Sequence, residues 1–137
     1  CTGGTISELL TSVPGSSAYY LGSVTSYANS VKRNILGVSS ETLERYGAVS
    51  SECVREMAEG VRRITGSDFS VATSGIAGPG GGSPEKPVGT VWIGVCSQMG
   101  TETFMLKFGG DRKRNIERFA AYAINLLRKK LIKETID

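Results

Sequence analysis

The 137-residue sequence contains no histidine, and this absence removes several kinds of catalytic site. A Ser-His-Asp triad, a Cys-His dyad and any zinc site with a histidine ligand are excluded. A nucleophile in this chain must be activated by another group, and lysine is the obvious candidate. Cysteine is scarce too, because Cys1, Cys53 and Cys96 lie far apart and form no C-x-x-C pair. We therefore expect no disulfide and no zinc ribbon, but small buried thiols in a reducing cytoplasm.

Long apolar runs and a strong charge of one sign are also missing. No run approaches the roughly 18 residues that a membrane-spanning helix needs, so we expect a soluble protein. Sixteen basic residues stand against thirteen acidic ones, which gives a formal net charge of +3. This balance suits a small anionic ligand and gives little support to nucleic-acid binding, which concentrates basic residues on one face. The basic clusters at 112–114 and 128–130 fall in one predicted helix and are interpreted as its solvated face.

Helical and strand patterns alternate along the chain. Apolar residues at helical spacing predict a helix over 5–13, and β-prone residues predict a strand over 20–27. Later segments predict a hairpin followed by a long helix. This order indicates an α/β fold, a three-layer α/β/α sandwich with a mixed sheet. The remaining expected elements are helices at 29–36, 39–47 and 50–66, strands at 69–73, 88–95 and 104–108, and a helix from Asp111 to about Lys133.

The segment 75–89 is rich in glycine and proline and lies between predicted core strands. Glycine lets backbone N–H groups approach an anion closely, so this loop is a ligand-binding candidate, and a flexible surface loop is the alternative. It matches neither a Walker loop nor a dinucleotide fingerprint. Residues 83–86 match the catalytic motif S-x-x-K, but Pro84 and Pro87 argue against the helix that this motif needs.

Ser17 and Lys32 form a candidate nucleophile and base. Ser17 follows a Pro-Gly turn at a predicted helix start, where free N–H groups suit a developing oxyanion. Lys32 lies in the first turn of a short helix, whose positive end, together with burial, is expected to lower the pKa of the amine. A capped turn and a solvated surface lysine are the alternatives, since the sequence does not show that the two side chains meet.

Several short motifs occur together in one known family. They are Cys1-Thr2-Gly3-Gly4, residues 13–17, 26–32 and 46–50, Ser74–Pro79 with Glu85–Thr90, and Phe108–Arg112. In combination they resemble the C-terminal domain of the competence/damage-inducible protein CinA, the nicotinamide-nucleotide amidase family, over nearly the whole chain. The resemblance implies a hydrolase that converts nicotinamide mononucleotide to nicotinic acid mononucleotide and ammonia in pyridine-nucleotide salvage. It also implies a five-stranded, mixed and mostly parallel sheet.

The resemblance maps the catalytic serine to Ser17, the lysine to Lys32 and an assisting tyrosine to Tyr27. No metal and no cofactor is implied. The nucleotide phosphate needs a positive, backbone-rich pocket, and the sequence offers candidates at a helix start, in the glycine-rich loop and on the last helix. The expected substrate-binding residues are Thr2, Gly3, Gly4, Thr73, Gly75, Gly78, Gly81 and Arg112.

Two departures from the family pattern bear on this hypothesis. The usual Tyr-Ser-Asn-Glu-x-Lys stretch has Ala28 and Ser30 in place of a small residue and an acid. The family motif begins Glu-Ser-Cys-Thr-Gly-Gly, whereas this chain starts at the cysteine. We therefore expect residues 1–137 to form a single amidase-like domain truncated at its N-terminus. The first core strand, and a serine close to the catalytic pair, would lie outside this sequence.

A second hypothesis from a different class stays open. The same fold could serve as a non-catalytic nucleotide-sensing or protein-interaction domain, and fold alone does not decide between the two. Ser17 and Lys32 within hydrogen-bond distance would favour the enzyme, and a wide separation would favour the binding module. A small nucleotide is the expected partner, a membrane is not, and a homo-oligomer is left open beside a monomer.

Overall fold

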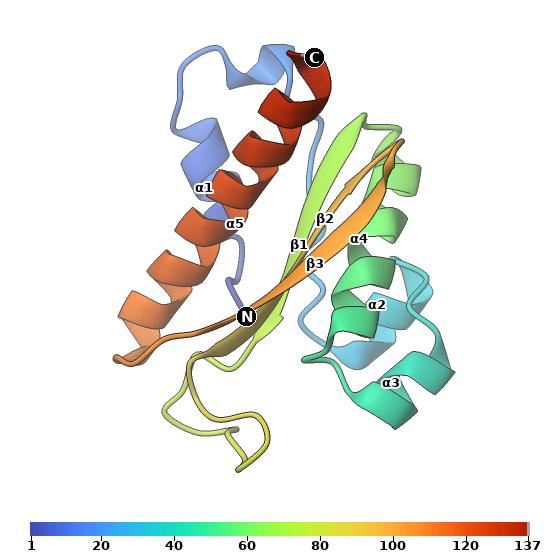
Figure 1. Cartoon of the computed structure of the whole chain (residues 1–137). Coiled ribbons are helices and arrows are strands. Elements are labelled where there is room, and N and C mark those ends of the chain that lie inside the picture. The colour runs from blue at the N-terminus through green and yellow to red at the C-terminus, as the bar shows by residue number, and fades with distance from the viewer. Residues whose placement is uncertain (137) are drawn as a thin grey trace.

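Helices and a small sheet make up the computed structural model, which describes residues 1–136 (Figure 1). The helix expected over 5–13 is observed over Thr5–Thr11, and the long last helix is present as predicted. The elements are α1 (Thr5–Thr11), the 3-10 helix η1 (Ser16–Ala18), α2 (Asn29–Asn34), α3 (Ser40–Tyr46), α4 (Ser51–Thr65), β1 (Phe69–Gly75), β2 (Thr90–Ser97), β3 (Gly100–Lys107) and α5 (Arg112–Thr135).

The sheet of the described residues has three strands in the order β1-β2-β3, and both pairings are antiparallel. The predicted hairpin is confirmed, with Ser97 opposite Gly100 across a two-residue turn. The expected mixed, mostly parallel sheet is wrong for this part of the chain. The expected strand at 20–27 is extended but carries no ladder hydrogen bonds, because no strand lies beside it. One edge of β1 is therefore unpaired.

Helices cover both faces of this sheet, which confirms the α/β class. Figure 1 shows α1 and α5 on one face and α2, α3 and α4 on the other. Strand β2 serves both cores, because alternate side chains point to opposite faces. Val91 and Ile93 pack with Phe119 of α5, whereas Cys96 packs with Val54 of α4. The two buried clusters fix the three layers relative to one another.

The sequence predicts an N-terminal capping residue for each of the helices α2, α3, α4 and α5, and three of these caps are confirmed. Ser50 caps α4 by accepting a hydrogen bond from the Cys53 backbone N–H (3.1 Å), and Asp111 caps α5 in the same way. Ser39 caps α3. Asn29, expected to cap α2, is instead its first helical residue, and the capping position is taken by Ala28 without a side-chain bond. The start of α2 therefore relies on its surroundings rather than on a cap.

Helix α5 has 24 residues and carries eight lysine and arginine side chains. Across residues 1–136, no helix combines the length and the apolar character needed to cross a membrane. The interpretation of 128–130 as a wholly solvated face is wrong at Lys130, whose side chain is only 7% exposed. The helix turns this side chain toward the sheet, where carboxylates receive it.

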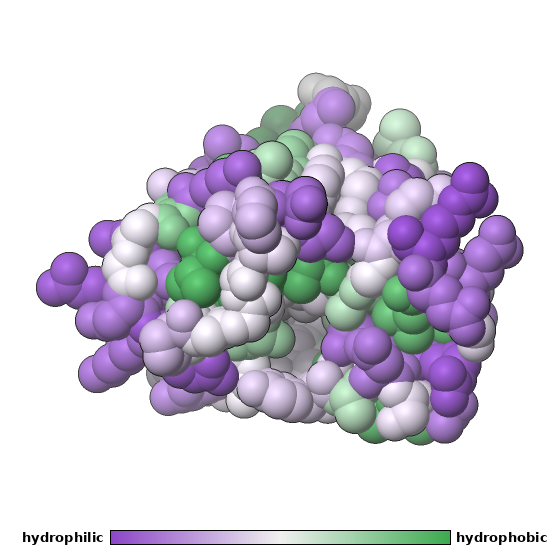
Figure 2. Space-filling model, turned by 90° about the horizontal axis from the view of Figure 1, so that it is seen from below, coloured by the Kyte–Doolittle hydropathy of each residue, from purple (hydrophilic) through white to green (hydrophobic). Residues whose placement is uncertain are grey.

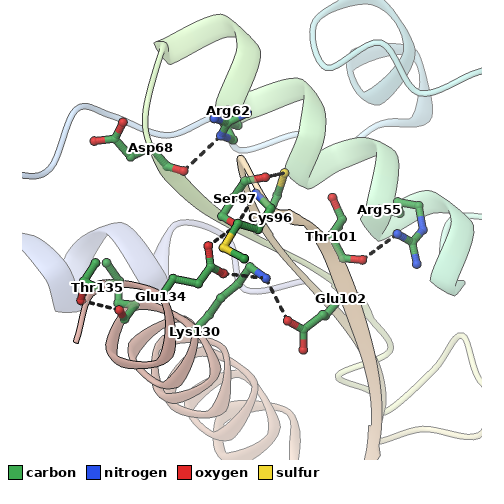
Figure 3. Close-up of polar contacts among 12 residues, drawn as sticks. Arg55, Arg62, Asp68, Cys96, Ser97, Thr101, Glu102, Lys130, Glu134 and Thr135 are labelled. Atoms are coloured by element: carbon green, nitrogen blue, oxygen red, sulfur yellow. Dashed lines mark hydrogen bonds and ion pairs between the residues drawn. The ribbon is translucent and has the colours of Figure 1, made fainter. Parts of the chain in front are cut away.

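A partly buried ion network joins the end of α5 to the hairpin (Figure 3). The Lys130 Nζ lies 2.8 Å from Glu102 Oε1 and 2.9 Å from Glu134 Oε2. Ser97 donates a hydrogen bond to Glu134 Oε1. Burial alone would lower the pKa of Lys130, but the bonds to Glu102 and Glu134 outweigh it and raise that pKa. The same bond to Lys130 lowers the pKa of Glu102, and bonds from Ser97 and Lys130 lower that of Glu134.

This network predicts that Lys130→Met lowers the free energy of unfolding, because it leaves Glu102 and Glu134 without the ammonium that both contact. The difference from the unaltered chain should be full at neutral pH. It should shrink as the pH falls through the lowered pKa values of Glu102 and Glu134, because protonated carboxyls no longer need the ammonium. Chemical denaturation between pH 3 and 7 measures this difference. Lys129→Met, at an exposed neighbouring position, is the control and should stay within about 0.5 kcal/mol. An equal effect of both variants would contradict the role of the network.

Candidate functional site

A groove of about 760 Å³ runs along the unpaired edge of β1. The extended segment 18–27 forms its opposite side, so the groove lies where a further strand would fit between them. Most of its walls are apolar side chains of the helices above and below the sheet. One end is polar, and there the structure brings together several of the residues that the sequence proposed. These are Thr2, Gly3, Gly4, Tyr27, Lys32 and Thr73.

Lys32 is the central titratable group at the polar end. Helix α2 places its side chain inward, where it is only 6% exposed. The Nζ atom donates to the backbone carbonyls of Ser26 (2.8 Å) and Tyr27 (3.3 Å). Burial lowers the pKa of Lys32, and the nearby Cys53 thiol and Tyr27 phenol offset part of this effect. A neutral amine that uses its two N–H bonds on these carbonyls has a free lone pair, which is what a general base requires.

The sequence predicted a lowered pKa for Lys32 from burial and from the positive end of a helix. Burial is the largest cause in the folded chain. The groups that bury Lys32 come from distant parts of the sequence, Cys53 of α4 among them. Burial raises the pKa of that thiol to about 11, and the charge of Lys32 partly counteracts the shift. Cys53 is thus an uncharged part of the wall beside the amine.

Positive charge gathers around the start of the chain. Burial, followed by the charges of Lys32 and Arg112, lowers the pKa of the Cys1 amino group to about 6. The Cys1 nitrogen therefore lies near both cations. Arg112 reaches this place from the first turn of α5: its Nη1 donates to the Gly78 carbonyl (2.8 Å) and its Nη2 to the Tyr27 hydroxyl (3.4 Å). The Tyr27 ring itself is exposed and lies across the edge of the site.

The small and hydroxyl residues of the predicted site fall into two groups. Thr2 and Thr73 are both buried, and their hydroxyl oxygens lie 3.3 Å apart. Gly3 and Gly4 follow Thr2 and lead into α1, both with positive φ. The other glycines belong to the segment after β1: Gly75 ends that strand, Gly78 accepts the bond from Arg112, and Gly81 lies exposed further along the loop.

Ser17 is the one catalytic candidate that lies outside this cluster. It is exposed on η1 and does not line the groove. Figure 1 shows η1 near the C-terminal end of α5, at the opposite end of the molecule from α2. None of the hydrogen bonds of residues 1–136 involves its side chain. The extended segment after η1 carries the chain away from Ser17 before it reaches Lys32.

The serine and lysine of the S-x-x-K motif form a turn, as the two prolines predicted. Ser83 Oγ accepts from the Lys86 backbone N–H (3.0 Å), and Lys86 Nζ donates to the Tyr46 carbonyl (2.6 Å). This lysine therefore ties the loop to α3 and does not face Ser83. Within residues 1–136, no three His, Cys, Asp or Glu side chains are placed to hold a metal ion together.

Two residues at the site were missed by sequence reasoning. The carbonyl of Ser26 holds Lys32, and a backbone atom leaves no signal in the sequence. Asn115 is completely buried and bridges the loop and α5. A signal existed here, because Asn115 stands on the apolar face that carries Phe119 and Ala123, where a polar side chain needs a partner.

Figure 2 shows the molecule from below, the side on which the loop 76–89 lies in Figure 1. The surface is hollowed near its centre. Pale and green residues lie around the hollow, whereas the most hydrophilic residues stand mainly toward the outside. The combination of an apolar recess with a few fixed polar groups is typical of sites for small molecules.

Fold and site together define an α/β domain with a buried lysine at the polar end of a groove. The profile of the CinA C-terminal domain family matches residues 1–131. A CinA-like protein of Fervidobacterium nodosum is 52% identical over 133 residues, which are 97% of this chain and 33% of that protein. One of Desulfosudis oleivorans is 54% identical over 134 residues, 96% of this chain and 32% of that protein. The chain therefore belongs to the CinA C-terminal domain family, and it spans about a third of the length of these curated relatives.

Solved structures agree with this assignment. The crystal structure of competence damage-inducible protein A (ComA) from Klebsiella pneumoniae superposes with a TM-score of 0.94 at 37% identity, covering 98% of this chain and 84% of that one. A CinA superfamily protein from Escherichia coli gives a TM-score of 0.91 at 32% identity, covering 96% and 76%. The arrangement of helices and strands described above is therefore that of the CinA superfamily.

The burial of Lys32 predicts a pH dependence of stability. Its pKa is lower in the folded chain than in the unfolded chain, so the unfolded state binds more protons between the two values. Stability should therefore rise as the pH increases through the folded pKa toward the ordinary value of 10.5. Denaturant unfolding at pH 6 to 10 should show that Lys32→Met loses this rise. Lys113→Met, at an exposed position of α5, should keep it. A rise that persists in Lys32→Met would assign the effect to another group.

Proposed function

We propose that this domain is an amidohydrolase that converts nicotinamide mononucleotide to nicotinic acid mononucleotide and ammonia. The observation that carries the proposal is the buried Lys32 amine, held by two backbone carbonyls at the polar end of a groove and without a carboxylate partner among residues 1–136. Membership of the CinA family supports an enzymatic role of this kind. A lysine in this state can accept a proton near neutral pH, as amide hydrolysis without histidine requires.

In this proposal Lys32 is the general base and Tyr27 assists it. The base takes the proton of an attacking hydroxyl and later passes it to the departing ammonia. The Tyr27 hydroxyl lies beside Arg112 at the edge of the site, where it can donate a hydrogen bond to the substrate amide. Lys32 and Tyr27 are connected through the Tyr27 carbonyl, so one short segment sets the positions of both groups.

Arg112 and the backbone around it are the proposed phosphate contacts. One guanidinium contacts Gly78 and Tyr27, and its remaining N–H groups can serve a phosphate oxygen. Thr2, Gly3 and Gly4 precede α1 in the groove wall, and Thr73 and Gly75 end β1 beside them. Gly81 belongs to the same loop as Gly78. The reaction would take place in the cytoplasm, where thiols such as Cys53 stay reduced.

The nucleophile of this proposal must lie close enough to Lys32 for the amine to take its proton. Ser17 is the serine that the family resemblance assigns, but it does not line the groove that holds Lys32. Family members with the pattern Glu-Ser-Cys-Thr-Gly-Gly carry a second serine, bonded to the nitrogen of the residue equivalent to Cys1. The Cys1 nitrogen of this chain lies within the electrostatic influence of Lys32. A serine in that position is the candidate that the geometry favours for attack on the amide.

A non-catalytic nucleotide-binding domain is the second candidate function. The specific observation in its favour is the separation of Ser17 from Lys32, because an amide cannot be cleaved by a serine that no base activates. The groove, Arg112 and the buried threonines would still bind a nucleotide. The two functions differ in one measurable outcome, which is whether bound nicotinamide mononucleotide releases ammonia.

The first test is the base itself. In a form of the domain with Glu-Ser joined ahead of Cys1, ammonia release from nicotinamide mononucleotide should fall by about 10²–10⁴-fold in Lys32→Ala, which is the usual contribution of a general base. Lys32→Arg should be nearly as damaging, because arginine keeps its proton. Lys113→Arg is the matched control on an exposed lysine. An active Lys32→Arg enzyme would contradict the general-base role.

The second test separates the serines and the two functions. A form of the domain with Glu-Ser joined ahead of Cys1 should release ammonia, and replacing that added serine by alanine should reduce the rate by about 10⁴-fold or more. Ser17→Ala in the same protein should stay within about tenfold of it, because Ser17 is exposed and far from the amine. A large loss in Ser17→Ala alone would restore Ser17 as the nucleophile. Binding without ammonia release in every form would favour the non-catalytic domain.

A further inference from the structure

The start of α5 is tied to the glycine-rich loop by two of its own side chains. Arg112 Nη1 donates to the Gly78 carbonyl (2.8 Å), and one turn later Asn115 Nδ2 donates to the Ala77 carbonyl (3.0 Å). Asn115 Nδ2 also donates to the Gly110 carbonyl (3.3 Å), just ahead of the helix. Two consecutive carbonyls of the loop are thus held by two side chains of one helix.

The Asn115 and Arg112 side chains differ in their exposure to solvent. Asn115 is completely buried, and so is its neighbour Ala77. Arg112 is exposed and reaches the Tyr27 hydroxyl over the end of the groove that holds Lys32. A buried amide with two carbonyl acceptors has one favourable orientation, whereas an exposed guanidinium has several. The orientation of Arg112 therefore depends on where the loop carbonyl at Gly78 is held.

We propose that Asn115 is a positioning residue, which holds the Ala77–Gly78 backbone against the start of α5 and thereby places Arg112 over the Lys32 end of the groove. It touches no substrate and acts through Arg112. This inference rests on the proposed function for the identity of the ligand, nicotinamide mononucleotide. The contacts that carry it are independent of whether that ligand is hydrolysed.

The decisive measurement is a double-mutant cycle on ligand affinity. Asn115→Leu keeps the volume of the side chain and removes its donors, and Arg112→Ala removes the contact that Asn115 is proposed to place. Titration calorimetry with nicotinamide mononucleotide should show a loss of about tenfold or more in affinity for Asn115→Leu. In the Arg112→Ala background the same change should cost less than about twofold, since residues that act through one another are not additive. Asn125→Leu, on the same helix, is the control and should bind like the unaltered chain.

Amide hydrogen exchange gives a readout that needs no ligand. The N–H groups of Ile76 and Gly89 donate hydrogen bonds beside Ala77, to the Thr90 and Ile76 carbonyls. Their exchange should accelerate in Asn115→Leu and stay unchanged in Asn125→Leu, because only the first loses the bond to the loop. Equal losses of affinity in both backgrounds, or unchanged exchange at Ile76 and Gly89, would overturn the positioning role. An unaltered chain that fails to bind nicotinamide mononucleotide would refute the proposed function. Accelerated exchange in that case would still support the part of Asn115 in holding the loop.

Discussion

The burial of one amino group is the constraint on which the rest of the site depends. Lys32 is enclosed between the carbonyls of Ser26 and Tyr27 and the wall of α4, and no carboxylate of the described part of the chain pairs with it. Such burial disfavours the ammonium form and costs stability in the protonated state. The apolar cluster around Val54 and Met57 packs α4 on the sheet and offsets this loss of stability. A well-packed core thus keeps a poorly solvated amine in place.

Helix α5 organises the opposite side of the molecule through groups at its two ends. At its start, Arg112 and Asn115 hold the loop that follows β1. Near its end, Lys130 joins the hairpin through Glu102 and Glu134. Between them, Phe119 and Ala123 pack on β2. Because α5 packs on β2 and also holds this loop, the sheet and the loop keep a fixed position relative to one another.

The local elements were largely predictable, whereas the sheet was not. The serine and aspartate caps at Ser50 and Asp111 form bonds within their own segments, so the sequence around them sufficed. The hairpin from β2 to β3 is likewise local. Residues 20–27 have a strand-like composition but no ladder, because strand formation requires a neighbouring backbone at the right distance. Composition describes a preference of the segment and says nothing about its neighbour.

At the candidate site, too, the sequence predicted the kinds of residue, whereas the tertiary structure decided which of them lie together. The sequence alone determined the lack of histidine chemistry, and its motifs made Lys32, Tyr27 and Arg112 candidates for the site. Only the tertiary structure decided which of them meet. It joined Arg112 to Tyr27 across 85 positions, left Ser17 exposed on η1 outside the groove, and buried Asn115 against the loop. Burial and proximity decide pKa and chemistry, and both arise from segments that are distant in the chain.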